Sequence, residues 1–203
     1  MNEENPILIL VLMGIVGYIA FTWWSDFGKS GSSSEQALLP GASKASRKAV
    51  AVAIVGTVAL LLGEVFGEIS LGIADAQSQM TILFACYTLF AAFGEEFVFR
   101  GFLYYDKGGS GLLVTSCVAV SVLFALLHGY VVKWEEGAIL FDFGTKALFS
   151  TSAIFVGSLW FYWLRFNILN PTCSLIPCIV AHLTKNLGVI LVKAAQGHLV
   201  GLY

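Results

Sequence analysis

The sequence predicts an all-α fold, a polytopic transmembrane helical bundle with about six spans. Of its 203 residues, 58% are hydrophobic and 12% are charged, whereas soluble domains carry about 25% charged residues. So few charged side chains cannot cover a soluble domain, and the mean hydropathy of +0.83 agrees. The alternating strands of about ten residues that a membrane β-barrel needs are not recognisable. We therefore expect residues 1–203 to form a single integral membrane domain in contact with the lipid bilayer.

The charge and the cysteines of the chain exclude further classes. The net charge is −2 and the pI is about 5.9, with no arm rich in Lys or Arg, so nucleic acid is not an expected partner. The cysteines lie in or beside apolar runs, where they are expected to act as small hydrophobes rather than as disulfides or zinc ligands. They are Cys86, Cys117, Cys173 and Cys178.

The first expected span is Ile7–Trp24. It has 18 residues without a charge, enough to cross a hydrocarbon core of ~30 Å at ~1.5 Å per residue. Glu3 and Glu4 precede it where a signal peptide would carry Lys or Arg, so we expect a retained span rather than a cleaved signal. Trp23 and Trp24 suit the aromatic belt at a membrane interface.

The remaining elements follow from a polar stretch and further apolar runs. Residues 25–48 combine a Gly/Ser-rich segment with a basic end and predict a flexible polar loop. The expected spans after it are Ala49–Phe66, Met80–Tyr105, Leu112–Val132, Ala147–Phe166 and Ser174–Val192. Lys and Arg residues are in excess on the inner loops if the N-terminus lies outside. The expected location is the cytoplasmic membrane of a prokaryote or the endoplasmic reticulum membrane of a eukaryote.

Three ionisable residues interrupt the third apolar run. Glu95, Glu96 and Arg100 lie within six residues of a segment that otherwise carries no charge, although a charge at the bilayer centre costs ~2.5–3.5 kcal/mol on insertion scales. Glu96 and Arg100 are four residues apart and can pair on one helical face. Glu95 is rotated by about 100° from Glu96 and remains available to a neighbouring helix.

Two later spans carry further polar residues. His128 follows the fourth run, and His182 and Asn186 share one face of the last span at a spacing of four residues. Polar side chains in a membrane bundle tend to face inward and contact one another. At ~1.5 Å per residue, Glu95, His182 and Asn186 lie at similar depths, whereas His128 falls deeper. Tilted helices, or a helical hairpin whose turn lies further in, would bring His128 to the depth of the other three.

These three segments resemble the CAAX protease and bacteriocin-processing family of intramembrane endopeptidases, which includes the type II CAAX prenyl endopeptidases. The resemblance rests on Glu95-Glu96-x-x-x-Arg100, Phe124-x-x-x-His128 and His182-x-x-x-Asn186 in that order. It covers residues 90–188, the core that carries the three motifs. The family implies a peptide or protein substrate, cut near a prenylated C-terminus in the CAAX members, while other members act on bacteriocin precursors.

The resemblance implies a role for each candidate residue. Glu95 would be the general base that activates water, and His128 would help to hold and polarise that water. His182 and Asn186 would donate to the oxyanion of the tetrahedral intermediate. Glu96 and Arg100 would be supporting residues that orient these four side chains. The reaction would then be the hydrolysis of a peptide bond by an intramembrane glutamate-type endopeptidase without a cofactor.

The same residue types also fit other functions. Two histidines and a glutamate are also a zinc ligand set, so a metalloprotease is the less favoured variant, since no His-Glu-x-x-His is present. A small membrane transporter or channel would place the same residue types inside a bundle, and so would a non-catalytic adaptor of the same fold.

Polar residues outside the motifs receive simpler expectations. Glu64 and Glu68 are expected to line the mouth of the second span, and Lys185 either faces the cavity of His182 or extends to an interface. Residues 133–143 predict an exposed amphipathic loop. His198 is expected to be structural or exposed to solvent.

Overall fold

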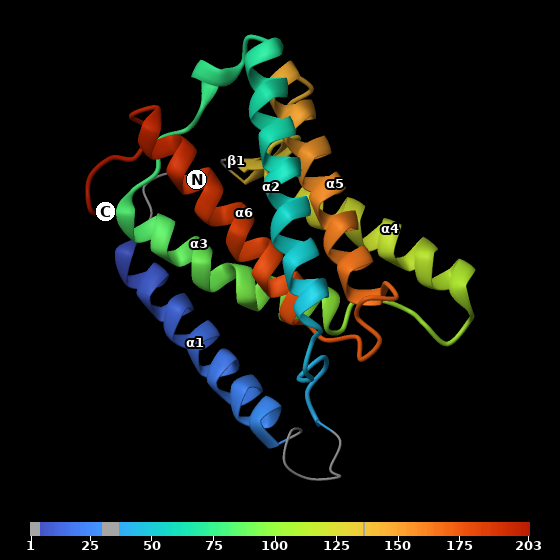
Figure 1. The fold of residues 1–203 in the computed structure, drawn as a ribbon. Helices are drawn as coiled ribbons and strands as arrows, with labels where there is room; N and C mark the ends of the chain where they lie inside the picture. Colours follow the sequence, from blue (N-terminus) through green and yellow to red (C-terminus); the bar gives the residue numbers. More distant parts are fainter. Residues whose placement is uncertain (1–4, 30–36, 136) are drawn as a thin grey trace.

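The computed structural model describes residues 5–29, 37–135 and 137–203 and confirms the all-α fold (Figure 1). Six of its helices are long and apolar enough to cross a membrane, once the π-helical turn η2 is counted with α3. The elements in chain order are α1 Pro6–Lys29, α2 Arg47–Ser70, η1 Ala74–Ala76, α3 Ile82–Glu95, η2 Glu96–Arg100, α4 Ser110–Leu127, β1 Val132–Glu135, β2 Ala138–Phe141, α5 Thr145–Phe166 and α6 Ile176–Ala195.

Side-chain caps fix the starts of two of these helices. The Ser46 hydroxyl accepts a hydrogen bond of 3.0 Å from the backbone N–H of Ala49 at the start of α2. Thr81 does the same for Phe84 at the start of α3, at 3.2 Å. Each hydroxyl satisfies a backbone donor that the first turn of a helix leaves without a partner. Both helices therefore begin within three residues of the expected apolar runs.

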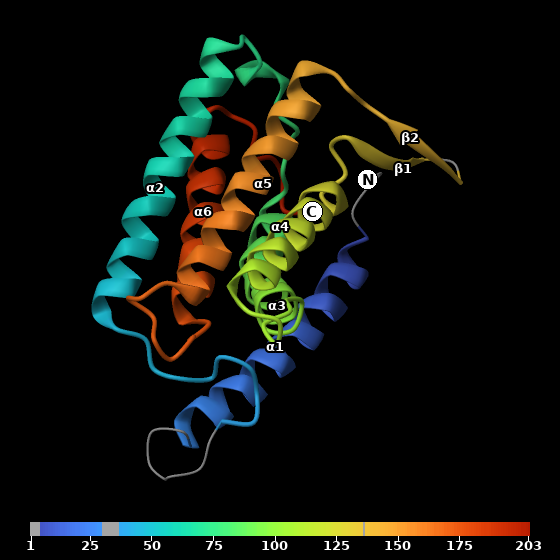
Figure 2. The same cartoon turned by 90° about the vertical axis from the view of Figure 1, so that its right-hand side faces the viewer.

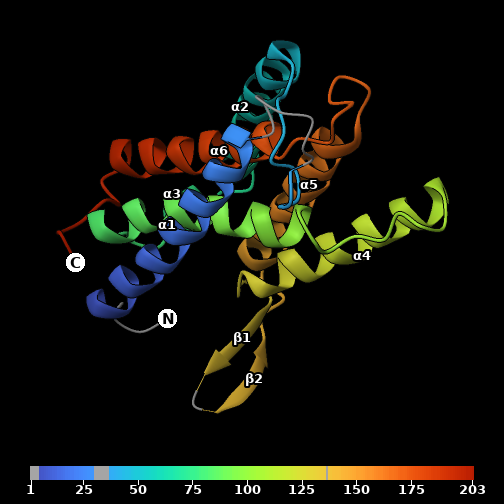
Figure 3. The ribbon, with the colours of Figure 1, turned by 90° about the horizontal axis from the view of Figure 1, so that it is seen from below.

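The helices pack in pairs, and the third span, α3 with η2, contacts α1, α5 and α6. α2 packs against α6, α4 against α5, and α1 against α3, while α6 also contacts α3 and α5 (Figures 1 and 2). η2 contacts α5 and α6. The views show α3 and α6 inclined steeply to α2 and α5 (Figures 1 and 3). Two of the three charged residues of this segment, Glu96 and Arg100, are fully buried in the protein.

Small residues permit the close contact between α2 and α5. A Cβ atom at Gly56 of α2 would lie 2.3 Å from the Trp160 ring of α5. That ring is held in place, because Trp160 Nε1 donates a 3.0 Å hydrogen bond to the Thr57 hydroxyl. Glycine at helix interfaces in membranes allows backbones to approach, and the polar contact adds specificity.

We expect Gly56→Ala to lower the free energy of unfolding by about 1–3 kcal/mol, because the added methyl group overpacks the interface with Trp160. Gly63→Ala is the matched control in the same helix, where a Cβ would meet no atom within 4 Å. It should be neutral or stabilising by up to about 1 kcal/mol. Unfolding in mixed detergent micelles measures both variants, and equal effects would contradict the packing argument.

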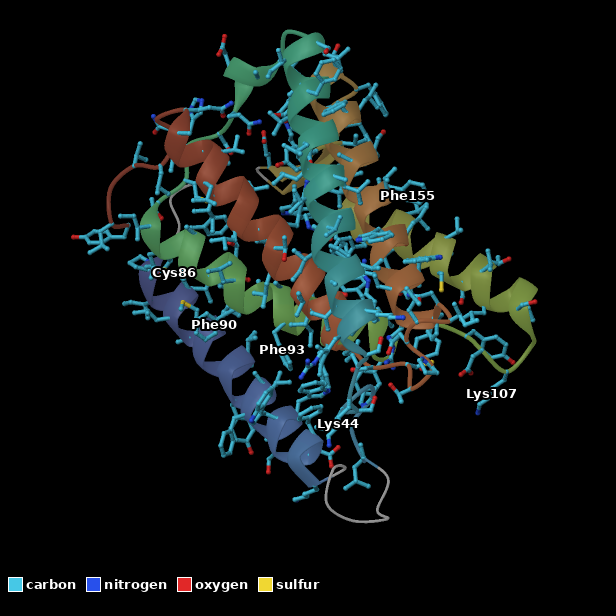
Figure 4. All side chains as sticks on the ribbon, in the orientation of Figure 1. Lys44, Cys86, Phe90, Phe93, Lys107 and Phe155 are labelled. Atoms are coloured by element: carbon cyan, nitrogen blue, oxygen red, sulfur yellow. The ribbon has the colours of Figure 1, made fainter. Side chains whose placement is uncertain are left out.

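α1 packs on α3 through aromatic side chains. Phe93 of α3 faces α1 (Figure 4), and its ring centroid lies 5.8 Å from that of Trp23. Trp23 is buried and donates from Nε1 to the carbonyl of Pro40 at 3.0 Å, whereas Trp24 is exposed. The expectation of two interfacial tryptophans is therefore wrong for Trp23, because a long-range backbone acceptor draws it into the protein.

The expected polar loop 25–48 differs from the structure at both ends. Its first five residues continue α1 to Lys29, and residues 47 and 48 begin α2. The described residues 37–46 are held by hydrogen bonds to distant segments: Asp26 Oδ2 accepts from the Leu39 N–H at 2.7 Å, and the Leu175 N–H donates to the Gly41 carbonyl at 3.0 Å. The Gly/Ser-rich residues 31–34 lie outside the described residues.

The expected loop 133–143 contains a β-hairpin. β1 and β2 pair antiparallel, with Lys133 opposite Leu140 and Trp134 opposite Ile139, and the hairpin projects away from the helices (Figures 2 and 3). All four residues of β2 are exposed. With no buried face, the strand shows no alternation of apolar and polar residues, which is the usual signature of a strand in a sequence.

An exposed ion pair closes the open end of the hairpin. Lys133 Nζ lies 2.9 Å from Asp142 Oδ2, and the Gly144 backbone N–H donates to Oδ1 at 2.8 Å. The Gly144 hydrogen bond, followed by that of Lys133, holds the pKa of Asp142 below its ordinary value. Asp142 therefore favours this hairpin end at neutral pH, and the contribution is lost as the pH falls through its lowered pKa.

The C-terminal tail lies against the start of α3. The backbone N–H of Met80 donates to the His198 carbonyl, and the Val200 N–H donates to the Met80 carbonyl, both at 2.9 Å. The Leu83 N–H donates to Leu202 at the same distance. The tail therefore pairs with the backbone that leads into the helix carrying Glu95.

Candidate active site

The two neighbouring glutamates lie where α3 changes into a π-helical turn. α3 ends at Glu95, and η2 spans Glu96–Arg100, with the Gly101 N–H donating to the Glu96 carbonyl at 3.1 Å. A Cβ at Gly101 would lie 2.0 Å from the Phe97 carbonyl oxygen, so this turn requires glycine. π-Helical turns occur frequently at functional sites because they redirect side chains within a helix.

Glu96 and Arg100 form the ion pair expected from their spacing. Arg100 Nη1 lies 3.1 Å from Glu96 Oε1, and neither side chain is exposed. Arg100 Nη2 donates to the Ser158 hydroxyl of α5 at 2.6 Å, and that hydroxyl donates to Ser121 of α4 at 2.9 Å. The pair is thus the centre of a buried hydrogen-bonded chain that joins η2, α4 and α5.

Aromatic rings surround the Arg100 guanidinium. Its central carbon lies 4.4 Å from the centroid of the Phe124 ring, 5.0 Å from Tyr162 and 5.2 Å from Phe161. Cation–π attraction and the Glu96 carboxylate together replace the water that a buried arginine loses. Arg100 therefore holds Glu96 from a site closed to solvent.

His182 of α6 is oriented by the buried carboxylate. Its Nδ1 lies 2.7 Å from Glu96 Oε1, and its ring stacks on Phe161 with centroids 5.1 Å apart. An ionised carboxylate can only accept, so Nδ1 carries the proton. Nε2 points to Glu95, whose Oε2 lies 3.8 Å away. His182 thus links the sealed pair Glu96–Arg100 to the second glutamate.

Glu95 differs from Glu96 in its surroundings. Its side chain is 34% exposed, and Oε2 accepts no hydrogen bond from the described residues. Glu95 lines a cavity of about 360 Å³, which Glu96 and Arg100 do not. Because Oε2 itself is buried, it is the exposed remainder of the Glu95 carboxylate, beside the cavity, that can accept a hydrogen bond from a water molecule.

His128 and Asn186 line the same cavity as Glu95 and His182. His128 Nδ1 donates to the Phe124 carbonyl at 2.7 Å, which leaves Nε2 free of that bond. Asn186 Nδ2 donates to the Thr88 carbonyl of α3 at 2.8 Å, and its second hydrogen is not used there. The structure therefore brings four of the six candidate residues to one cavity and places the other two behind it.

The depth expected for His128 is corrected by this arrangement. Counting residues along each span placed His128 apart from the other three, because the count assumed parallel helices. The helices are strongly inclined to one another (Figures 1 and 3), so rise along a helix does not convert into one common depth. The turn at the end of α4 thus reaches the cavity.

Several polar residues of the site were not recognised in the sequence. Ser121 and Ser158 complete the chain behind Arg100, and small polar residues facing other helices were the available signal. Lys185 pairs with Glu64 and lines the cavity of His182, which is one of the two positions expected for it; the other was a membrane interface. Glu68 also lines the cavity and pairs with Lys146 of α5.

Possible metal ligands are not clustered among the residues that the structure describes. Within residues 5–29, 37–135 and 137–203, no three His, Cys, Asp or Glu side chains are grouped so that they could hold one ion. All four cysteines are free thiols. The arrangement can polarise a water molecule and donate hydrogen bonds to a developing oxyanion.

Comparison with known proteins adds one match. A family model described as type II CAAX prenyl endopeptidase Rce1-like matches residues 77–188, which is more than half of the chain. The matched range runs from the segment before α3 into α6 and contains all six candidate residues. No curated protein and no solved structure matches the chain.

Proposed function

The chain belongs to the type II CAAX prenyl endopeptidase Rce1-like family, and on that premise we propose that it cuts a prenylated substrate near its C-terminus with water activated by Glu95. The family consists of CAAX-type intramembrane endopeptidases, so the protein is an integral membrane protease that acts on peptides or proteins. This membership favours hydrolysis over a transporter or an adaptor.

The different surroundings of the two glutamates support Glu95 rather than Glu96 as the general base. Glu96 Oε1 accepts hydrogen bonds from both Arg100 and His182 in a site without exposure, whereas Glu95 faces the cavity. A general base must reach the water whose proton it removes, within about 2.6–3.2 Å. Glu95 is the carboxylate that a cavity water can approach, and His128, which lines the same cavity, contributes to binding that water.

The other two cavity residues supply hydrogen bonds to the oxyanion. Asn186 has a free Nδ2 hydrogen, and His182 can donate from Nε2 when its ring carries both protons. The carboxylates of Glu96 and Glu95 lie beside the two ring nitrogens, 2.7 Å from Nδ1 and 3.8 Å from Nε2. Removal of one such donor lowers kcat by a factor of about 10²–10³. Glu96 and Arg100 act as positioning residues through His182.

The test is an assay of purified protein in detergent against matched prenylated and unprenylated peptides. We expect cleavage near the C-terminus of the prenylated peptide, with a lower rate for its unprenylated counterpart. Activity should persist in a chelator after metal removal, since the proposed water is activated by a carboxylate. Equal cleavage of both peptides would contradict a prenylated substrate, and loss of activity that Zn²⁺ restores would favour the metalloprotease variant.

A further inference from the structure

Two ion pairs line the catalytic cavity and have no role in the proposed hydrolysis: Glu68 with Lys146, and Glu64 with Lys185. Lys185 Nζ of α6 pairs with Glu64 Oε2 of α2, and each side chain is 20% exposed. Both residues also line a second cavity of about 350 Å³ between α2 and α5. The pair therefore lies where this cavity adjoins the one that holds Glu95 and His182.

The accessibility of this pair distinguishes it from the sealed pair of the same bundle. Glu96 and Arg100 are not exposed and are joined to further partners, whereas Lys185 has a carboxylate partner and open space beside it. Ionisable residues that line a cavity within a membrane mark the path of a substrate or ion. An ammonium group here can exchange one carboxylate for another without any change in the charge of the pair.

We propose that Lys185 binds the free C-terminal carboxylate of the substrate, which displaces Glu64 from the ammonium group. This inference rests on the proposed function. Lys185 would bind the part of the substrate that lies on the C-terminal side of the scissile bond. Glu64 neutralises the lysine while the site is empty, and it is released toward the cavities when substrate binds. A charge-assisted hydrogen bond between ammonium and carboxylate supplies the selectivity.

The position of Lys185 fits this assignment. It follows His182 by three residues on α6, so its Cα lies about 4.5 Å further along the helix on the same face. The long side chain extends its reach beyond that. Two or three residues of extended peptide span about 7–11 Å, which matches the combined reach of one helical turn and a lysine side chain. Lys185 would therefore select the distance between the cut bond and the chain end.

The test compares two prenylated peptides of identical sequence, one with a free C-terminal carboxylate and one with an amide. For the unmodified protein we expect kcat/KM to be about tenfold or more higher for the acid, chiefly through KM. Lys185→Met should reduce kcat/KM for the acid to the level of the amide. Glu64→Gln should lower KM for the acid, because the competing carboxylate is gone.

Two further variants keep the test decisive. Lys146→Met removes another cavity lysine, the partner of Glu68, and should retain the preference for the acid. If Lys185→Met does not fold, Glu64→Gln combined with Lys185→Met removes both charges and should also lose the preference. Cleavage of acid and amide at equal rates by the unmodified protein would overturn the inference and leave the proposed function standing. Cleavage of neither peptide would overturn both.

Discussion

Glu95→Gln is expected to lower kcat by about 10²–10⁴ while the protein remains folded. The amide keeps the size of the side chain but cannot take a proton from water. Because Glu95 Oε2 accepts no hydrogen bond from the described residues and lies 3.8 Å from His182 Nε2, the substitution breaks no hydrogen bond of that oxygen. Single-turnover kinetics with a prenylated peptide measure the loss, and size-exclusion chromatography with thermal unfolding checks the fold.

The matched control for this variant is Glu68→Gln. Glu68 lines the same cavity, and its partners are Lys146 and Gln77 rather than a histidine. Its substitution should change kcat only a fewfold, which separates base catalysis from the general loss of a negative charge. Proteolysis that is undiminished in folded Glu95→Gln protein would show that another group activates the water.

Arg100→Met is expected to lower the free energy of unfolding by about 3–5 kcal/mol, because it leaves the Glu96 carboxylate buried without its counterion. The aromatic rings around the guanidinium also lose a cation. Adding Glu96→Gln removes the unpaired charge and should recover part of the stability. Titration with a denaturing detergent measures the three proteins.

Measurements of activity distinguish the contribution of this pair to stability from its positioning of His182. In the double variant, the amide at position 96 no longer holds His182 Nδ1 as a carboxylate does, so kcat should stay low although stability recovers. Lys107→Met, at an exposed lysine that points away from the bundle (Figure 4), controls for the loss of one positive charge. If Arg100→Met and the unmodified protein have the same free energy of unfolding, Arg100 does not stabilise the buried Glu96 carboxylate.

Local patterns in the sequence predicted the spans and the sealed ion pair. An apolar run without charges specifies a membrane helix by itself, and a spacing of four residues determines that Glu96 and Arg100 meet. The separation of Glu95 from Glu96 also follows from helix geometry, and the structure places only Glu95 at the cavity. These predictions needed no knowledge of how helices pack.

Features that depend on tertiary packing could not be predicted in this way. The inclination of the helices brings His128 to the cavity, and a distant carbonyl buries Trp23. The residues 37–46 look polar and flexible, yet they bind the backbone before α6. The strand β2 escaped recognition because both of its faces are exposed. Each of these depends on partners far away in the chain.

The ion pair within η2 also bears on how the protein enters the membrane during synthesis. Ser158 and His182 lie on α5 and α6, so ribosomes make them well after Arg100 and Glu96. A lone arginine would cost ~2.5–3.5 kcal/mol on insertion scales at that moment. Because its carboxylate partner is four residues earlier in the same segment, this span carries its own counterion into the bilayer before the later helices arrive.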